Sequence, residues 1–190
     1  MAAKRKIKRT LPGDKGTFTP DSIDRMIRVN HAGEYGARRI YQGQLSVLGH
    51  DPKLKKILEH MAEQEEVHLA YFEDEIVRRN IRPTALHPLW HVAGYALGAL
   101  TARISPEAAM ACTVAVETVI SEHYGEQIEV LKKNPKEKKL LAAIKKFKAE
   151  EEEHHDIGID ENAEQAVAYQ LLTKLIMGGS KLAIEIAKRI

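Results

Sequence analysis

Apolar residues recur at helical spacing in four long stretches of the chain, and each stretch is bounded by Pro, Gly or Asn. The stretches cover residues 23–48, 53–79, 106–133 and 140–158. Thr19 and Pro20 form a typical helix start, and the segment from Gly49 to Pro52 would close the first helix. Helices of roughly 25 residues joined by short turns predict an all-α fold, an antiparallel four-helix bundle.

Each apolar stripe also carries acidic residues, and these recur in a fixed register. Glu34 and Glu117 stand alone on the first and third stripes, whereas the second and fourth stripes each contain a Glu-x-x-His pair, Glu65 with His68 and Glu151 with His154. At an offset of 83, Glu34, Tyr41, Gln44, Val47, Leu48, Pro52 and Lys53 match Glu117, Tyr124, Gln127, Val130, Leu131, Pro135 and Lys136. At an offset of 86, His68 matches His154. The sequence therefore indicates a duplicated helix pair, with halves at about 22–82 and 105–160.

This spacing predicts a site for two metal ions. Residues three apart on a helix share a face with Cβ atoms about 5–6 Å apart, so a Glu-x-x-His pair can direct a carboxylate and an imidazole at one ion. Four buried carboxylates would repel one another, whereas two divalent ions balance their charge. Oxygen ligands with one imidazole per ion suit iron or manganese, and the lack of thiolates argues against structural zinc. We predict a ferritin-like bundle that holds two iron ions through Glu34, Glu65, His68, Glu117, Glu151 and His154.

Several neighbouring residues have two interpretations. The run from Glu150 to Glu153 is typical of a solvated helix face, but Glu151 shares its apolar stripe with Ile144 and Phe147. His123, His155, Tyr124 and Tyr169 are candidates for orienting the ligands from behind; the alternative is a packing role with satisfied hydrogen bonds, which is also the interpretation of Tyr41.

The segment between the two halves, residues 83–104, breaks the repeat. Its stretch from Pro83 to Ala102 carries no formal charge and includes Trp90 and Tyr95. A membrane-spanning helix needs roughly 20 consecutive apolar residues. The part of the uncharged stretch that follows Pro88 is shorter than this, which fits a helix lying at a membrane interface, or a connection packed in the core, better than a membrane span. An interfacial helix beside an oxygen-activating site suggests a lipophilic substrate.

The last part of the chain continues the helical pattern. Residues 161–190 predict one or two further helices, broken near Gly178 and packed as an appendage on the bundle.

Charge and cysteine content narrow the classes further. Residues 1–20 carry six Lys and Arg against Asp14, a formal charge of +5, which leaves −3 for residues 21–190 of a chain with net charge +2. We interpret residues 1–20 as a disordered basic arm that attracts an anionic surface or serves as a solubilising tail, and residues 21–190 as one domain. No basic stripe with interleaved aromatics marks the domain, so a nucleic-acid partner is not expected. The single Cys112 excludes an intrachain disulfide and is expected to be a small buried residue.

Three motifs give the chain a family resemblance: HAGEYGA at 31–37, AMACTVAVE at 109–117 and EHHDIG at 153–158. They resemble the demethoxyubiquinone hydroxylases of ubiquinone biosynthesis over about residues 22–190. The resemblance implies a membrane-bound di-iron monooxygenase that uses O2 to hydroxylate the ring of a polyprenyl quinone intermediate, with the same six residues as iron ligands. It implies NADH as electron donor, although the sequence lacks a G-x-G-x-x-G fingerprint.

The resemblance leaves location and assembly open. Eukaryotic members begin with a mitochondrial presequence, and the short basic start favours a bacterial protein on the cytoplasmic face of the inner membrane, with the matrix side of the mitochondrial inner membrane as the alternative. Homo-oligomers and partners in a ubiquinone-biosynthesis complex are both compatible with the sequence. Two other functions remain: a ferroxidase or peroxide reductase related to ferritin or rubrerythrin, and a non-catalytic quinone- or lipid-binding regulator.

Overall fold

The computed structural model describes residues 20–189, which form six α-helices and two short 3-10 helices and contain no β-strand. The α-helices are α1 (Pro20–Leu48), α2 (Pro52–Arg79), α3 (His87–Ile104), α4 (Pro106–Leu131), α5 (Lys138–Asp160) and α6 (Tyr169–Ala187). The 3-10 helices are η1 (Pro135–Glu137) and η2 (Ala163–Gln165). The basic arm predicted for residues 1–20 falls outside the described residues except at Pro20, and so does Ile190.

Local side-chain chemistry sets the helix ends. The Asp51 carboxylate accepts hydrogen bonds from the backbone N–H groups of Lys53 and Leu54 at the start of α2, and Pro52 occupies the first turn. The Ser105 hydroxyl accepts a hydrogen bond from the N–H of Ala108 and starts α4 directly after α3. Asn80 ends α2 in the left-handed region, at φ 55°.

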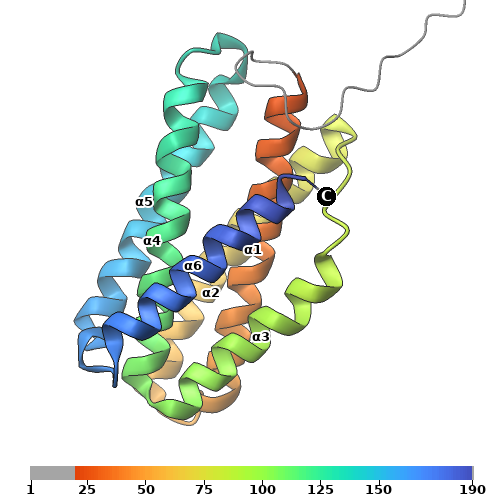
Figure 1. Cartoon of the computed structure of the whole chain (residues 1–190). Coiled ribbons are helices and arrows are strands. Elements are labelled where there is room, and N and C mark those ends of the chain that lie inside the picture. The colour runs from red at the N-terminus through yellow and green to blue at the C-terminus, as the bar shows by residue number, and fades with distance from the viewer. Residues whose placement is uncertain (1–19, 190) are drawn as a thin grey trace, which may run out of the picture.

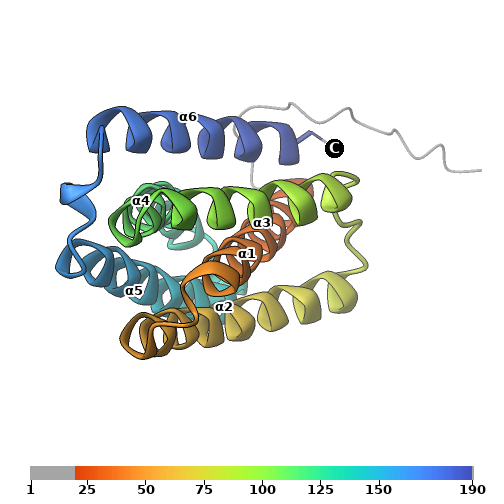
Figure 2. The same cartoon turned by 90° about the horizontal axis from the view of Figure 1, so that it is seen from below.

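The predicted four-helix bundle is confirmed: it consists of α1, α2, α4 and α5, with α3 and α6 laid against it (Figure 1). Helix α1 packs against α2 and α3, and α4 packs against α5 and α6. Seen from below, α6 lies along one side, α2 and α5 lie along the other, and α1, α3 and α4 overlap between them (Figure 2). Helices α3 and α6 both pack against α1 and α4, so within the described residues they cover the same side of the bundle.

Helix α3 approaches α1 through glycines. A Cβ atom on Gly98 would lie 2.0 Å from the carbonyl oxygen of Ile40, and one on Gly43 would lie 2.2 Å from that of Tyr95. Since these distances are far below van der Waals contact, the two backbones touch where larger residues would separate them.

The C-terminal segment departs from the sequence-based expectation. The sequence predicts a break near Gly178, but α6 runs unbroken through Gly178 and Gly179. The segment also does more than append to the bundle, because Thr173, Ile176 and Ala187 are buried against it. Among residues 20–189, no helix combines the length and apolar character that crossing a membrane requires.

Candidate metal centre

The four bundle helices bring all six predicted ligands together. Glu34, Glu65, His68 and Glu151 form one group, and Glu65, Glu117, Glu151 and His154 form a second; within each group one ligand atom per residue lies within 4.8 Å of all the others. Glu65 and Glu151 belong to both groups. Their carboxylates can therefore serve two neighbouring ions, while Glu34 and Glu117 can each serve one.

The donor atoms of these groups fit cations. All six side chains are buried, with at most 1% of each residue exposed. Both oxygens of Glu65 and Glu151, one oxygen each of Glu34 and Glu117, and Nδ1 of both histidines lack a hydrogen bond of normal geometry. Buried polar atoms without partners are costly, and a set of six oxygens and two nitrogens that face one another suits divalent metal ions.

The pKa values of several of the buried ligands are shifted because their charges lie close together away from water. Burial raises the pKa of Glu65 well above its usual value, and Glu151 and Glu34 raise it further by repulsion. Burial would lower the pKa of His68, but its close contacts with Glu151 and Glu34 raise that pKa to about 12. Burial and repulsion from Glu151 also raise the pKa of Glu117. Without a cation, protons must balance the buried charge, and a metal ion would displace them.

The duplication extends to residues behind the ligands. Tyr41 donates a 2.6 Å hydrogen bond to Glu117, and its repeat partner Tyr124 donates one to Glu34. Each tyrosine thus orients the glutamate of the other half, with a buried hydroxyl. The sequence marks Tyr124 as a candidate for this role, whereas it favours a packing role with a hydrogen-bonded hydroxyl for Tyr41. The offset of 83 that relates the two tyrosines is the signal that could have paired them.

Two further residues that the sequence analysis missed contact the histidines. Nε2 of His68 lies 2.9 Å from a carboxylate oxygen of Glu150, and Nε2 of His154 lies 2.6 Å from the amide oxygen of Gln64. The sequence places Glu150 in a solvated acidic face, although its side chain is only 18% exposed.

The remaining candidates lie farther from the ligands. The largely buried His123 lines a cavity, and burial lowers its pKa to about 4. His155 lies 3.0 Å from the neighbouring Asp156. Tyr169 begins α6 and packs against the core cluster that contains Tyr41. No contact between Tyr169 or His155 and a ligand is seen among residues 20–189. Cys112 is buried, as expected.

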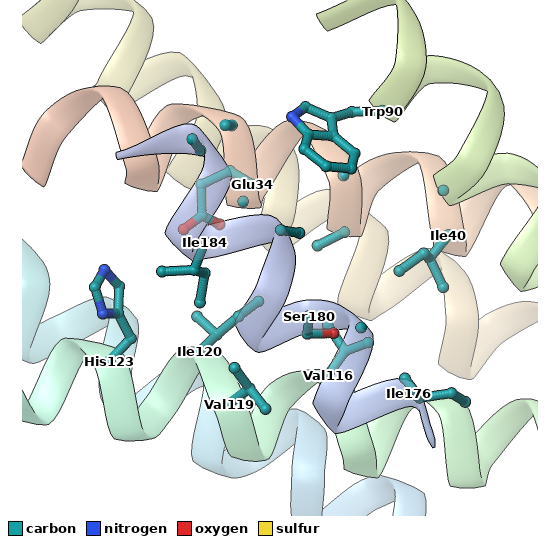
Figure 3. A pocket seen from close by; sticks show the side chains of 18 of the residues that line it. Glu34, Ile40, Trp90, Val116, Val119, Ile120, His123, Ile176, Ser180 and Ile184 are labelled. Atoms are coloured by element: carbon teal, nitrogen blue, oxygen red, sulfur yellow. The ribbon is translucent and has the colours of Figure 1, made fainter. Parts of the chain in front are cut away.

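A cavity of about 530 Å³ lies between α1, α3, α4 and α6 and reaches the metal site. Its wall is almost wholly apolar and runs from Trp90 on α3 past Glu34 to His123 on α4, with Ile184 of α6 close by (Figure 3). Of the six candidate ligands and the two tyrosines behind them, all within residues 20–189, only Glu34 and Tyr124 line the cavity. The cavity therefore adjoins the ion position that Glu34 can serve.

Comparisons with known proteins identify the family of this chain. The family described as "Ubiquinone biosynthesis protein COQ7" matches residues 21–187. The NADPH-dependent 3-demethoxyubiquinone 3-hydroxylase of Homo sapiens mitochondria is 50% identical over 171 residues, 89% of this chain and 78% of the relative. The 3-demethoxyubiquinol 3-hydroxylase of Rhodospirillum rubrum is 50% identical over 180 residues, 95% of this chain and 83% of the relative. The mitochondrial 5-demethoxyubiquinone hydroxylase of Saccharomyces cerevisiae is 44% identical over 182 residues, which cover 88% of this chain and 78% of the relative.

Proposed function

Because this chain belongs to the family of the ubiquinone biosynthesis protein COQ7, we propose that it hydroxylates the ring of a demethoxyubiquinone or demethoxyubiquinol intermediate in ubiquinone biosynthesis. The observation that supports this most strongly is the apolar cavity, which leads to a buried cluster of four glutamates and two histidines. An apolar cavity matches a polyprenyl quinone, and the cluster matches a redox metal.

The proposed cofactor is a pair of iron ions. Glu34 and His68 would hold one ion, Glu117 and His154 the other, and Glu65 and Glu151 would be shared. Bound there, iron supplies the Lewis acidity, the electrons and the O2-binding template that hydroxylation requires. The protein orients the ligands, through Tyr41 and its repeat partner, and excludes water from all six.

The cavity would hold the quinone ring against Glu34. The Tyr124 hydroxyl donates a hydrogen bond to a Glu34 oxygen, so that oxygen is held in place and the carboxylate presents a fixed face to the cavity. The apolar side chains around it, such as Val119 and Ile184, would exclude water from the ring and accept its isoprenoid chain.

The exposed apolar residues of α3 and α6 support a membrane surface as the source of substrate. These residues are at least 54% exposed and comprise Leu89, Val92, Leu100 and Ile104 of α3 with Leu171, Leu175 and Leu182 of α6. The same two helices line the cavity, so a lipid phase against them would lie close to it. We propose peripheral attachment through this face, to a bacterial inner membrane from its cytoplasmic side or to a mitochondrial inner membrane from the matrix side.

A reduced nicotinamide nucleotide is the proposed electron donor. The name of the human relative specifies NADPH, whereas the motif resemblance implied NADH. A direct comparison of the two nucleotides as reductants of the iron-loaded chain decides between them.

A quinone profile tests the proposed function. In a bacterial strain that lacks its own hydroxylase, the wild-type chain should restore ubiquinone, whereas Glu117→Gln should leave the demethoxy intermediate to accumulate. Glu129→Gln is the matched control, because Glu129 lies on the same helix with a 67% exposed side chain paired to Lys132. Normal ubiquinone with Glu117→Gln would refute the hydroxylase and favour the non-catalytic regulator.

The ferroxidase alternative is separated by iron content. A hydroxylase should bind two iron ions per chain and no more, whereas a ferritin-like ferroxidase should continue to oxidise and store iron beyond that number.

A further inference from the structure

The outward-facing nitrogens of the two candidate metal-binding histidines contact chemically different partners. Nδ1 of His68 points into the site, 3.1 Å from Glu151, and Nδ1 of His154 points into it, 3.3 Å from Glu65. With Nδ1 free for a metal ion, each ring carries its proton on Nε2 and must donate it outward. His68 donates to the carboxylate of Glu150, and His154 donates to the amide of Gln64.

These partners occupy equivalent positions in the duplication. Gln64 precedes Glu65 and Glu150 precedes Glu151, so the offset of 86 that relates the Glu-x-x-His pairs relates them too. Each contacts the histidine of the opposite helix, since Glu150 of α5 contacts His68 of α2 and Gln64 of α2 contacts His154 of α5. The pairing is therefore duplicated, and the two acceptors differ in chemistry, with a carboxylate behind His68 and an amide behind His154.

The difference in acceptor changes how strongly each imidazole can bind a metal ion. A carboxylate behind a ligating histidine accepts a stronger hydrogen bond than an amide and increases the electron density on the nitrogen that binds the metal. Both rings are fully buried, so water screens neither contact. Lys146 also contacts Glu150, but at 61% exposure it is an exposed ion pair of small effect.

The other ligands do not produce the same imbalance. Glu65 and Glu151 belong to both ion positions. Glu34 and Glu117 each accept one hydrogen bond from a tyrosine hydroxyl. Glu150 opposite Gln64 is thus a chemical asymmetry directly behind the ligands.

We propose that Glu150 and Gln64 make the two metal positions unequal, so that the position of Glu34 and His68 binds a divalent ion more tightly than that of Glu117 and His154. The inference rests on the metal centre of the proposed function and deepens it. The stronger position is also the one beside the cavity, because Glu34 lines it. The ion nearest the substrate would then be the more firmly held, with the more electron-rich imidazole.

Single-position variants of the full-length, metal-free chain test this with Co²⁺, followed by its visible absorption. His154→Ala leaves the His68 position complete, and His68→Ala leaves the His154 position complete. Glu150→Gln is expected to weaken Co²⁺ binding roughly tenfold or more in the His154→Ala background and to change it less than about twofold in the His68→Ala background. Gln64→Glu is expected to tighten binding only in the His68→Ala background.

Glu152→Gln is the matched control, because Glu152 lies two residues from Glu150 on α5 with a 56% exposed side chain that pairs with Lys148. It should change neither affinity. Far-UV circular dichroism of each metal-free variant confirms that the helices persist.

Each outcome decides the proposal. Equal weakening by Glu150→Gln in both backgrounds, or no weakening in either, would overturn the unequal positions while the metal centre stands. A wild-type chain that does not bind Co²⁺ would overturn the metal centre and this inference together.

Discussion

Replacing Gly98 with alanine is expected to destabilise the protein strongly, because the new methyl group would meet the backbone of α1. The added Cβ would lie 2.0 Å from the carbonyl oxygen of Ile40 and 2.8 Å from its carbonyl carbon. Neither atom belongs to a flexible side chain, so the two helices must move apart by about 1 Å or more to reach ordinary contact. Overpacking of this kind typically costs about 1–3 kcal/mol, and a clash with backbone belongs at the upper end.

Thermal unfolding followed by far-UV circular dichroism measures this cost. For a domain of this size, each kcal/mol lowers Tm by about 2–4 °C, so a cost near 3 kcal/mol predicts a fall of about 6–12 °C. Gly178→Ala is the control, because a Cβ on Gly178 meets nothing within 4 Å in the interior of α6. It should leave Tm unchanged or raise it, since alanine favours helix by up to about 1 kcal/mol. A Gly98→Ala protein as stable as wild type would refute the close contact of α1 and α3.

Three other predictions follow from the cavity, the metal centre and the exposed apolar face. Gly179 lines the cavity, so Gly179→Leu should raise KM for the quinone at least several-fold with little change in Tm. Gly178 does not line the cavity, so the control Gly178→Leu should leave KM unchanged. Equal KM values for the two variants would exclude the cavity as the quinone site. The pKa of His68 is raised to about 12, so the metal-free imidazole is protonated and metal binding must remove a proton from it. Calorimetry in buffers of different ionisation enthalpy should therefore detect proton release, and metal affinity should fall as pH falls. A metal affinity that does not depend on pH would contradict this prediction. Leu171→Glu should weaken sedimentation with lipid vesicles roughly tenfold, whereas Val77→Glu, on α2 away from α3 and α6, should not; equal losses would refute the proposed face.

The clustering of the six candidate ligands was predictable because helix geometry and the duplication fix their spacing in the sequence. A helix places Glu65 and His68 on one face wherever it lies in the fold, and the duplicated register located the second pair. The bundle followed from the same stripes, since four helices that each bury a carboxylate must converge. No assumption about tertiary contacts was needed.

The helix boundaries of the C-terminal segment were less predictable because packing outweighed local preference. Two adjacent glycines cost an isolated helix about 2 kcal/mol, which favoured a break at Gly178. Helix α6 continues because Thr173, Ile176 and Ala187, on both sides of the glycines, are buried against the rest of the molecule. Contacts of this kind join α6 to α4, which is distant in the sequence, and they leave no local pattern.

Glu150 was missed for a related reason. In a run of four glutamates, periodicity separates the inward residue from its neighbours but does not show that a flanking carboxylate reaches a buried histidine on another helix. The register held the information, since aligning Gln64 with Glu150 places both beside a candidate ligand. Only the opposed packing of α2 and α5 shows that each contacts the histidine of the other half.

The departures from symmetry gather around one ion position. Tyr41 and Tyr124 keep the two halves equivalent where buried charge must be balanced. The cavity, in contrast, reaches Glu34, the glutamate of the first half. The carboxylate of Glu150 contacts Nε2 of His68, the histidine of the same ion position. A duplicated site alone would present two equal ions to a substrate. Covering one side of the bundle with α3 and α6 would admit the substrate to one position, and the difference between Glu150 and Gln64 distinguishes that position chemically.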